Sequence, residues 1–484
     1  MKIDLVKLKK IVGNDNVSDD SADLYVYSSD ASVHQAMPSV IVRPKTTEEV
    51  QKIMEYANNN LIPVIPRGAG SSTSGHTVPI DSGIILDMKR MNRILEIRPE
   101  DMLVKVEPGV VDDDLNRALG PYNLFYPPAP ASSRIATIGG EIGANTSGMR
   151  SVKYGATRDV VLGMKVVLAN GDLIKLGSNT RVHTSGYQIE RLIVGSEGTL
   201  GIVVEATLKL VPLPKFRCLA IAKFNKLEDA GDAISDIISS GSSPSMLELM
   251  DNIGIKAVNK AINLGLPDVA AIILFEADGK VKATVNFEME TIKRTCKKHG
   301  GFGIEMSYDK KERERIYAGR KKLFASLSKY QEGIICTDLA DDMAVPNSKV
   351  AECAQKIHEI AKRNNVIMAV YGHCGSGVIH TKIMMDPKKR SQWDDAKHVI
   401  SELYDYVDSI GGVTSAEHGI GLSKAPSWKK ARKDLVPVAR LIKKALDPNN
   451  ILNPHKLMDA PDDWVTATNL RYQIKGQKER NRNL

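Results

Sequence analysis

PRGAGSSTSGHT, residues 66–77, consists mostly of small residues and directly follows LIPVI, a strand-like run at 61–65. Small residues let a backbone approach a ligand closely, and successive N–H groups in such a loop suit the oxygens of a diphosphate. The segment has three interpretations: a Walker A loop, a Rossmann fingerprint, or a glycine-rich turn that binds nothing.

Neither nucleotide motif fits the spacing of this loop. Gly70 and Gly75 have Walker A spacing, but His76 occupies the lysine position and Pro79 would stop the helix that must follow. The glycines at 68, 70 and 75 also lack the GxGxxG spacing of a Rossmann fingerprint. A turn that binds nothing is the commonest role of a single glycine cluster.

A second stretch of small residues favours ligand binding. YPPAPASSRIATIGGEIGANTSGMRSVKYG, residues 126–155, has few large apolar side chains, so we expect a long loop that packs no core of its own. Long loops in compact domains are usually functional or disordered, and the strand-like run at 160–174 follows this one. Two such loops in the same half of the chain could hold both sides of a dinucleotide.

The N-terminal region predicts a β-α-β start. Residues 40–42 form a short apolar strand, and Thr46 with Glu49 has the spacing of a capping box. The apolar face of the helix that follows comprises Val50, Ile53, Met54 and Ala57. Strands are expected at 61–65 and within 83–94 and 103–110, and a helix at 112–119.

The rest of the chain predicts a second domain and a returning segment. A strand within 192–215 closes the first region, and Pro212 and Pro214 mark a boundary. Helices then alternate with strands, including a helix from Val350 to Ala361 and another that ends at 411–412. The turn-rich run from 413 is too short to fold alone, so we expect it to pack on an earlier domain. The expected segments are 1–215, 216–410, 411–457 and a tail at 458–484.

Composition indicates an ordinary globular protein. The 484 residues are 42% hydrophobic and 26% charged, and 66 Lys and Arg against 58 Asp and Glu leave a net charge of +8. This small excess, with 5% aromatic residues, argues against nucleic-acid binding. Five cysteines without a CxxC pair indicate a reducing compartment, which we interpret as the cytoplasm. No stretch approaches the roughly 18 apolar residues of a membrane span.

Three motifs, in this order, resemble one flavoprotein superfamily. PRGAGSSTSG at 66–75, ATIGGEIGANTSGMRSVKYG at 136–155 and GSEGTLGIVVEATL at 195–208 are similar to the PCMH-type FAD-binding domain of the vanillyl-alcohol oxidase and p-cresol methylhydroxylase superfamily. The C-terminal half, including LDPNNILNP at 446–454, resembles its D-lactate dehydrogenase and glycolate oxidase branch. The resemblance, which runs to Leu457, implies an α+β fold: an FAD-binding domain of two α+β subdomains, a ferredoxin-like substrate (cap) domain, and a C-terminal segment that returns to the FAD domain.

The resemblance also implies where FAD binds. The diphosphate and ribityl chain would lie between residues 67–75 and 138–148, with Tyr154 and Gly155 nearby, and Gly198 with Ile202 would face the adenine side. Some members attach flavin covalently to a histidine in the first loop, but the corresponding residues at 70–72 are Gly-Ser-Ser, so we expect noncovalent FAD. The residues implied in FAD binding are Pro66, Arg67, Gly68, Ala69, Gly70, Ser71, Ser72, Ser74, Gly75, Thr137, Ile138, Gly139, Gly140, Gly143, Ala144, Asn145, Ser147, Gly148, Tyr154, Gly155, Glu197, Gly198, Ile202 and Asn453.

His373 and His380 lie in YGHCGSGVIHTK, residues 371–382. Residues seven apart point to opposite faces of an unbroken strand, and Gly375 and Gly377 disfavour a helix. A glycine-mediated reversal would bring the two imidazoles together; otherwise one histidine caps a strand and the other is exposed. With Glu417, which is followed by His418, two histidines and one carboxylate complete a protein ligand set for a divalent cation.

The resembled branch typically shows GHxGDGNxH followed by a Glu-His pair. Carried over position by position, this implies that His373, His380 and Glu417 bind zinc, manganese or iron and that His418 is the catalytic base. The motif departs from the family at two positions, since Ser376 and Val378 replace Asp and Asn, which puts the substrate in question.

Arg320 in YAGRKKLFASL lies where the branch commonly places an arginine for the substrate carboxylate. The other interpretation is a solvated basic helix face, since two lysines follow.

The resemblance implies oxidation of a small D-2-hydroxy acid, with D-lactate to pyruvate as the first choice. His418 would take the hydroxyl proton while hydride passes to flavin N5. The alternatives are a glycolate or 2-hydroxyglutarate dehydrogenase, an enzyme like alkylglycerone-phosphate synthase, a noncatalytic flavin-binding subunit and, most distantly, a P-loop hydrolase. The electron acceptor stays open, with an iron–sulfur partner subunit among the candidates, as do a homo-oligomer and contact of the basic tail with a membrane surface.

Overall fold

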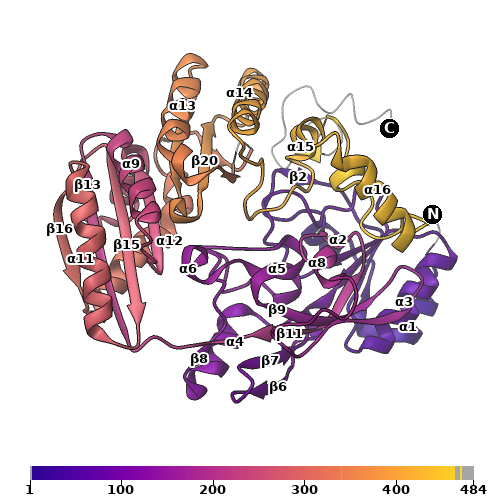
Figure 1. The fold of residues 1–484 in the computed structure, drawn as a ribbon. Coiled ribbons are helices and arrows are strands. Elements are labelled where there is room, and N and C mark those ends of the chain that lie inside the picture. Colours follow the sequence, from indigo (N-terminus) through magenta and orange to yellow (C-terminus); the bar gives the residue numbers. More distant parts are fainter. Residues whose placement is uncertain (1–2, 340, 464–468, 471–484) are drawn as a thin grey trace. The chain divides into compact units, whose positions relative to one another are not determined.

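The computed structural model describes residues 3–339, 341–463 and 469–470, which divide into two compact units of mixed α/β structure (Figure 1). The first unit contains 3–147, 155–213, 417–463 and 469–470. The second contains 148–154, 214–339 and 341–416. The chain therefore crosses from one unit to the other at 147/148, 154/155, 213/214 and 416/417.

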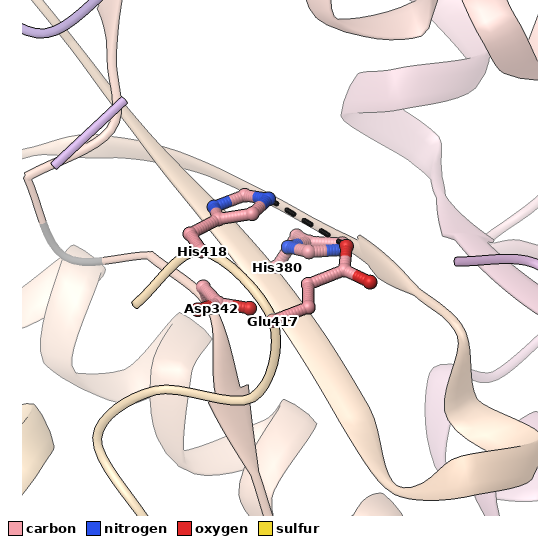
Figure 2. A group of neighbouring side chains, drawn as sticks. All are labelled: Asp342, His380, Glu417 and His418. Atoms are coloured by element: carbon pink, nitrogen blue, oxygen red, sulfur yellow. Dashed lines mark ion pairs between the residues drawn. The ribbon is translucent and has the colours of Figure 1, made fainter. Parts of the chain in front are cut away.

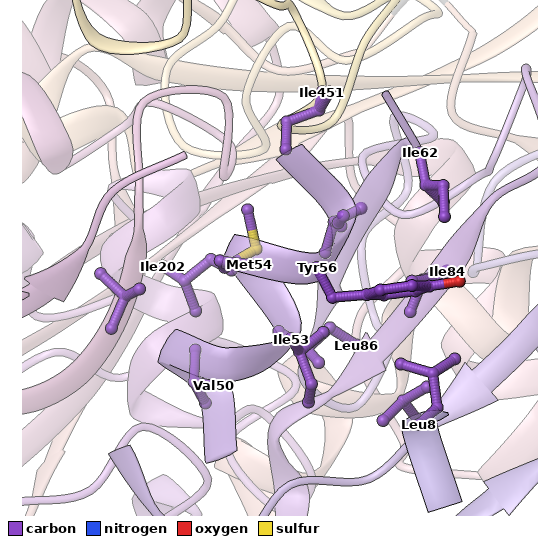
Figure 3. Packing of buried hydrophobic residues seen from close by; sticks show 14 of the residues in the cluster. Leu8, Val50, Ile53, Met54, Tyr56, Ile62, Ile84, Leu86, Ile202 and Ile451 are labelled. Carbon is purple, nitrogen blue, oxygen red and sulfur yellow. The ribbon is translucent and has the colours of Figure 1, made fainter. Parts of the chain in front are cut away.

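A four-stranded sheet with helix α3 (Thr47–Asn59) begins the first unit. Its strand order is β1 (Val17–Ser18), β3 (Val40–Val42), β5 (Ile84–Asp87) and β4 (Val64–Arg67), and β3 and β4 run parallel to β5. Thr46 caps α3 by accepting the Glu49 N–H at 3.2 Å, while the Glu49 carboxylate accepts the Lys45 N–H at 2.6 Å. The predicted apolar face is buried together with Tyr56 (Figure 3). Strand β4 starts later than expected because Leu61 has a left-handed φ of 53°.

A five-stranded antiparallel sheet forms the other half of the first unit. Its order is β10 (Leu173–Gly177), β9 (Val161–Val167), β11 (Ile202–Lys209), β7 (Leu103–Val106) and β6 (Ile94–Arg98). The expected helix at 112–119 is α4 (Asp112–Leu119). The smaller elements of the unit are α1 (Leu5–Val12), α2 (Ser21–Tyr27), β2 (His34–Gln35), β8 (Leu124–Phe125), α7 (Thr157–Val160), α8 (Glu190–Ile193), β12 (Val211–Pro212) and β21 (Asn469–Leu470).

The expectation of a coreless loop at 126–155 is wrong in part. Helices α5 (Ile138–Ala144) and α6 (Ser151–Tyr154) form within it, and Thr137 caps α5 by accepting the Gly140 N–H at 3.3 Å. Ile138 and Ile142, four residues apart on α5, are fully buried in the core beneath the five-stranded sheet. The high glycine content conceals this helix in the sequence, although the i, i+4 apolar pair is present.

The second unit is an eight-stranded antiparallel sheet with helices. Its strand order is β16-β13-β15-β14-β19-β20-β17, and β18 pairs with β20. The predicted helix over 350–361 is α13, the next long helix is α14, and Gly411 follows α14 with a left-handed φ of 78°. The elements are β13 (Phe216–Phe224), α9 (Leu227–Ser239), β14 (Met246–Asp251), α10 (Asn252–Ile262), β15 (Ala271–Gly279), α11 (Lys282–Lys298), β16 (Phe302–Ser307), α12 (Lys310–Leu327), β17 (Ile335–Thr337), β18 (Met343–Ala344), α13 (Val350–Arg363), β19 (Ile367–Gly372), β20 (Val378–Met385) and α14 (Arg390–Ser409).

The C-terminal segment returns to the first unit, as expected. It forms α15 (Ala425–Ala431) and α16 (Leu435–Leu446), and Ile451 and Leu452 are buried in the core beside α3. The Val64 N–H donates to the Ile451 carbonyl at 2.7 Å, and the Asn453 N–H donates to the Val64 carbonyl at 2.9 Å. Most of the predicted tail, 464–468 and 471–484, lies outside the described residues. Every helix in the described part of the chain falls short of a membrane span in length or in hydropathy.

Candidate cofactor pocket and histidine cluster

A pocket of about 640 Å³, counted with its open mouth, lies in the first unit between the two glycine loops. GSEGTLG contributes the third part of its wall. Of the residues expected to bind FAD, those that line this pocket are Pro66, Arg67, Gly68, Thr137, Gly139, Gly140, Gly143, Ala144, Glu197, Gly198 and Ile202.

Close backbone approach explains the glycines of this wall. A Cβ on Gly68 would lie 2.2 Å from the Thr137 hydroxyl oxygen, which joins the first loop to the second. A Cβ on Gly139 would lie 2.6 Å from Pro108 Cβ. At Gly143 a Cβ would meet nothing within 4 Å, so its absence leaves the pocket open. A cradle of bare main chain suits a diphosphate, and the residues present therefore fit FAD.

Eight residues line the pocket without having been predicted: His76, Thr77, Met88, Pro108, Ile193, Ser196, Gly201 and Val203. Five of them, His76, Thr77, Ser196, Gly201 and Val203, lie inside the glycine-rich stretches 66–77 and 195–208, so extending the prediction to every residue of those stretches would have included them. The remaining three, Met88, Pro108 and Ile193, carry no signal in the sequence.

The other expected FAD residues lie elsewhere. Ile138 is buried in the core, and Asn145 ends α5 with a left-handed φ of 53°. Gly148 and Tyr154 belong to the second unit, where the Tyr154 hydroxyl donates to the Asp278 carboxylate at 2.9 Å. The residues outside the pocket lining are Ala69, Gly70, Ser71, Ser72, Ser74, Gly75, Ile138, Asn145, Ser147, Gly148, Tyr154, Gly155 and Asn453.

A hairpin in the second unit brings His373 and His380 together. Strand β19 ends at Gly372, a short turn follows, and Gly377 with a φ of 77° leads into β20. The two imidazole centroids are 5.3 Å apart, with the rings edge to face at 88°. Of the two arrangements that the sequence left open for these histidines, the structure has the glycine-mediated reversal. Cys374 in the turn is buried, and burial raises the pKa of its thiol.

Each of these histidines has a carboxylate at its Nδ1. His373 Nδ1 lies 2.7 Å from Glu248 Oε1, and His380 Nδ1 lies 3.2 Å from Asp341 Oδ1. An ionised carboxylate only accepts, so each Nδ1 carries the proton and Nε2 is the nitrogen suited to a metal. Metal-binding histidines are commonly oriented by such carboxylates, so this donor set fits a divalent metal.

Glu248 also receives Arg320, whose Nε donates to Glu248 Oε2 at 2.7 Å. Burial alone would raise the pKa of Glu248, but the electrostatic attraction and hydrogen bonds of His373 and Arg320 overcome it and lower the pKa. Arg320 is only 7% exposed, and its guanidinium lies 4.9 Å from the centre of the Tyr371 ring. Because Arg320 is buried, it does not belong to a solvated basic helix face, which was the other interpretation of this residue.

A buried lysine balances the charge of Asp341. Lys382 forms ion pairs with both Asp338 and Asp341. Burial alone would lower the pKa of Lys382, but the two carboxylates raise it well above its usual value. The Tyr404 hydroxyl donates to the Asp341 main-chain carbonyl at 3.0 Å. Asp341 is thus held in place to orient His380.

Asp342, which the sequence did not indicate, is buried beside His380. It has a left-handed φ of 68°, and potential ligand atoms of the two residues lie within 4.8 Å of each other (Figure 2). The Asp342 carboxylate accepts the Ser415 hydroxyl at 2.8 Å, and its carbonyl accepts the Ala416 N–H at 2.9 Å. Asp342 therefore ties the second unit's last residues to the histidine hairpin.

Glu417 and His418 begin the next part of the first unit. His418 Nε2 lies 3.5 Å from Glu417 Oε1, the ion pair dashed in Figure 2. The Ser147 hydroxyl donates to Glu417 Oε2 at 2.6 Å, and the Thr73 hydroxyl oxygen lies 3.5 Å from His418 Nδ1. Glu417 is buried, whereas 26% of the His418 side chain is exposed. The pair therefore lies against both glycine loops.

Comparison with known proteins gives two family matches and a shared fold. Residues 38–177 match the FAD binding domain, and 213–457 match the C-terminal domain of FAD linked oxidases. The chain is 36% identical to the glycolate oxidase subunit GlcD of Bacillus subtilis, over 93% of this chain and 96% of that one. It is 33% identical to a mitochondrial cytochrome D-lactate dehydrogenase of Arabidopsis thaliana, over 94% and 80%. The structure of p-cresol methylhydroxylase shares the fold, with a TM-score of 0.75, 20% identity and coverage of 93% and 95%.

Proposed function

The chain belongs to the FAD-linked oxidases, and on that premise we propose that it oxidises a small D-2-hydroxy acid, with D-lactate as the first substrate. One observation carries the proposal: two imidazoles held 5.3 Å apart, each oriented by a carboxylate, in a chain of this family. A carboxylate and an adjacent hydroxyl are the groups that such a site, loaded with a cation, would bind.

FAD would be held noncovalently by the pocket of the first unit, where it supplies the acceptor for the hydride that leaves the α carbon. The main chain of the two glycine loops would cradle the diphosphate. At residues 70–72 this chain has Gly-Ser-Ser, with no imidazole to form a covalent bond. His76 is in the pocket wall, but its Nε2 lies 3.4 Å from Glu197. Colour that stays with the protein after acid precipitation would contradict noncovalent binding.

His373, His380 and Glu417 would bind a divalent metal, which supplies positive charge for the substrate oxygens. The chain's connectivity supports the inclusion of Glu417. The N–H of Ala416 donates to the Asp342 carbonyl, and Glu417 is the next residue, one Cα step of about 3.8 Å away. Asp342, next to His380, is an additional candidate ligand.

His418 would accept the hydroxyl proton and Arg320 would bind the substrate carboxylate. The exposed fraction of His418 leaves its imidazole accessible, and histidine is the side chain that most often transfers protons in catalysis. Arg320 is buried, and it donates to Glu248, the carboxylate that also contacts His373 of the histidine hairpin. A guanidinium can bind a substrate carboxylate through two parallel hydrogen bonds.

Glycolate is the second candidate substrate, because the relative at 36% identity is named a glycolate oxidase subunit. D-lactate carries a methyl group where glycolate has hydrogen, so a pocket beside the α carbon would decide between them.

The word subunit in the name of that relative also supports a separate redox partner as electron acceptor. We place the protein in the cytoplasm, in keeping with its five free cysteines.

The test is anaerobic reduction of the bound flavin, followed by its visible absorption. D-lactate should bleach the flavin, and L-lactate, glycolate and 2-hydroxyglutarate should do so more slowly. His418→Asn should keep FAD and slow bleaching by about 10²–10⁴-fold, while His398→Asn on the exposed face of α14 should have no effect. A flavin that no 2-hydroxy acid reduces would overturn the proposal, and faster reduction by glycolate would change the substrate.

A further inference from the structure

We propose that Glu197 is a positioning residue that clamps the turn carrying His418 onto the wall of the cofactor pocket. The inference rests on the proposed function only where it treats His418 as the base. The contacts that make the clamp all lie within the first unit.

Glu197 holds two consecutive backbone amides of this turn. The Ile420 N–H donates to Glu197 Oε1 at 2.6 Å, and the Gly421 N–H donates to Oε2 at 2.9 Å. Each carboxylate oxygen thus has its own donor, and hydrogen bonds to an ionised acceptor are the strong ones. Glu197 is 5% exposed, and its left-handed φ of 55° is a strained conformation for a residue with a side chain. Such strain persists where surrounding contacts hold it.

The first glycine loop holds the turn from the other side. The Leu422 N–H donates to the Ser74 carbonyl at 2.7 Å, and the Ser74 hydroxyl donates to the Gly419 carbonyl at 3.3 Å. A Cβ on Gly419 would lie 2.4 Å from the His76 ring and 2.8 Å from the Glu197 carboxylate. The turn therefore packs directly on His76 and Glu197, with no space for a side chain between them.

These contacts fix the residue that comes immediately before Gly419, which is His418. Glu197 and His76 both line the pocket proposed for FAD, and the side chains of both contact the turn. Asn453 ties them together, because its amide donates to the carbonyls of His76 at 2.9 Å and Glu197 at 2.7 Å. The clamp consequently couples the shape of the cofactor pocket to the position of the proposed base.

The variant that tests the clamp is Glu197→Gln, which keeps the size of the side chain but replaces one acceptor oxygen by a donor. Amide hydrogen exchange at 420 and 421 should rise by about 10–100-fold in the protein without FAD, as expected for loss of a charge-assisted hydrogen bond. In the loaded enzyme kcat should fall by a similar factor, while KM and the FAD Kd change by less than about threefold.

Asp447→Asn is the matched control. Asp447 is buried in the same unit, and its carboxylate also accepts two consecutive backbone amides, those of Ile451 at 3.1 Å and Leu452 at 2.8 Å. This variant should speed exchange at 451 and 452 and lower kcat much less than Glu197→Gln does, because the two backbone amides that it releases lie outside the turn that carries His418. If Glu197→Gln does not fold, Gly421→Ala perturbs the turn from its other side, since its Cβ would lie 2.2 Å from the Ser74 carbonyl.

The outcomes separate the two proposals. Unchanged exchange at 420 and 421 in Glu197→Gln would overturn the clamp, whatever the activity. Faster exchange with unchanged kcat would show that the clamp does not position the base. If no 2-hydroxy acid reduces the wild-type flavin, the proposed function fails, whereas the exchange measurement still tests the clamp.

Discussion

Gly143 lies in α5 and in the wall of the pocket, where a Cβ would project into open space. Gly143→Ala should therefore leave folding intact or stabilise α5 by up to about 1 kcal/mol, since alanine is favoured over glycine in helices. The added methyl group should raise the FAD Kd by about tenfold, measured by quenching of flavin fluorescence. Gly120→Ala is the control, because its Cβ also meets nothing but lies away from the pocket. Equal FAD affinity in the two variants would contradict FAD binding in this pocket.

His34 provides a prediction of pH dependence at the same scale. It is buried with Nε2 3.0 Å from the Ser423 hydroxyl oxygen, and burial, with a contribution from Lys456, lowers its pKa to about 3. Unfolded histidine titrates near 6.5, so between about pH 6.5 and 3 the unfolded chain binds a proton that the folded chain does not. The free energy of unfolding should fall by up to about 1.4 kcal/mol per pH unit as pH drops through this window.

Urea unfolding at several pH values measures this slope. His34→Gln removes the titrating group and should flatten the dependence, while the exposed His398→Gln should keep the wild-type slope. A wild-type slope in His34→Gln would show that other groups cause the loss of stability.

The residues around the histidines show which parts of the site could be predicted from the sequence and which could not. His373, His380, Glu417 and His418 were predicted because they lie in short motifs with a recognisable spacing. Glu248 was not, because it occurs in an ordinary strand and reaches His373 only through the antiparallel pairing of β14 with β19. The register between two strands that lie more than a hundred residues apart in the chain cannot be predicted from any short stretch of the sequence.

At the scale of elements, prediction succeeded where local signals decide the structure. Helix α3 has its cap at Thr46, and α13 and α14 have continuous apolar faces, so all three follow from short-range physics. Helix α5 was missed because its glycines disfavour a helix, and burial of Ile138 and Ile142 in the core stabilises it instead. Elements that depend on tertiary packing are those that the sequence conceals.

The histidine hairpin depends on Gly377. Its φ is 77°, and a Cβ would lie 2.2 Å from the Val345 carbonyl. Gly377→Ala should lower the free energy of unfolding by about 3 kcal/mol or more and reduce the content of the proposed divalent metal, because the two imidazoles would no longer converge. Urea unfolding and elemental analysis measure the two effects.

Gly333→Ala separates strain from steric overlap. Gly333 has a similar φ of 79°, but a Cβ there meets nothing within 4 Å. Only the strain of the left-handed conformation remains, about 1–2 kcal/mol, and metal content should be unchanged. Similar losses in both variants would contradict a specific role for the hairpin.

At the scale of the whole chain, its three separated parts complete one core in the first unit. The sequence predicted that the last part would pack on an earlier domain, because a turn-rich segment of that length cannot fold alone. It did not predict that Ile451 and Leu452 would join α3 and the four-stranded sheet, since a short apolar pair fits many cores. The glycine loops and the turn that carries His418 thus depend on a core that is complete only when the C-terminal segment packs into it.

Ile451→Ala tests this dependence. Ile451 is 1% exposed in the core shown in Figure 3, so its truncation should lower the stability of the first unit by about 2–5 kcal/mol. Hydrogen exchange should rise in α3 and β4, and strands β14 and β19 of the second unit should exchange as before. Leu441→Ala on the same segment is the control. Leu441 is 69% exposed, so its truncation should change neither the stability of the first unit nor the hydrogen exchange in α3 and β4. Unchanged exchange in α3 would show that the first unit's core does not need the returning segment.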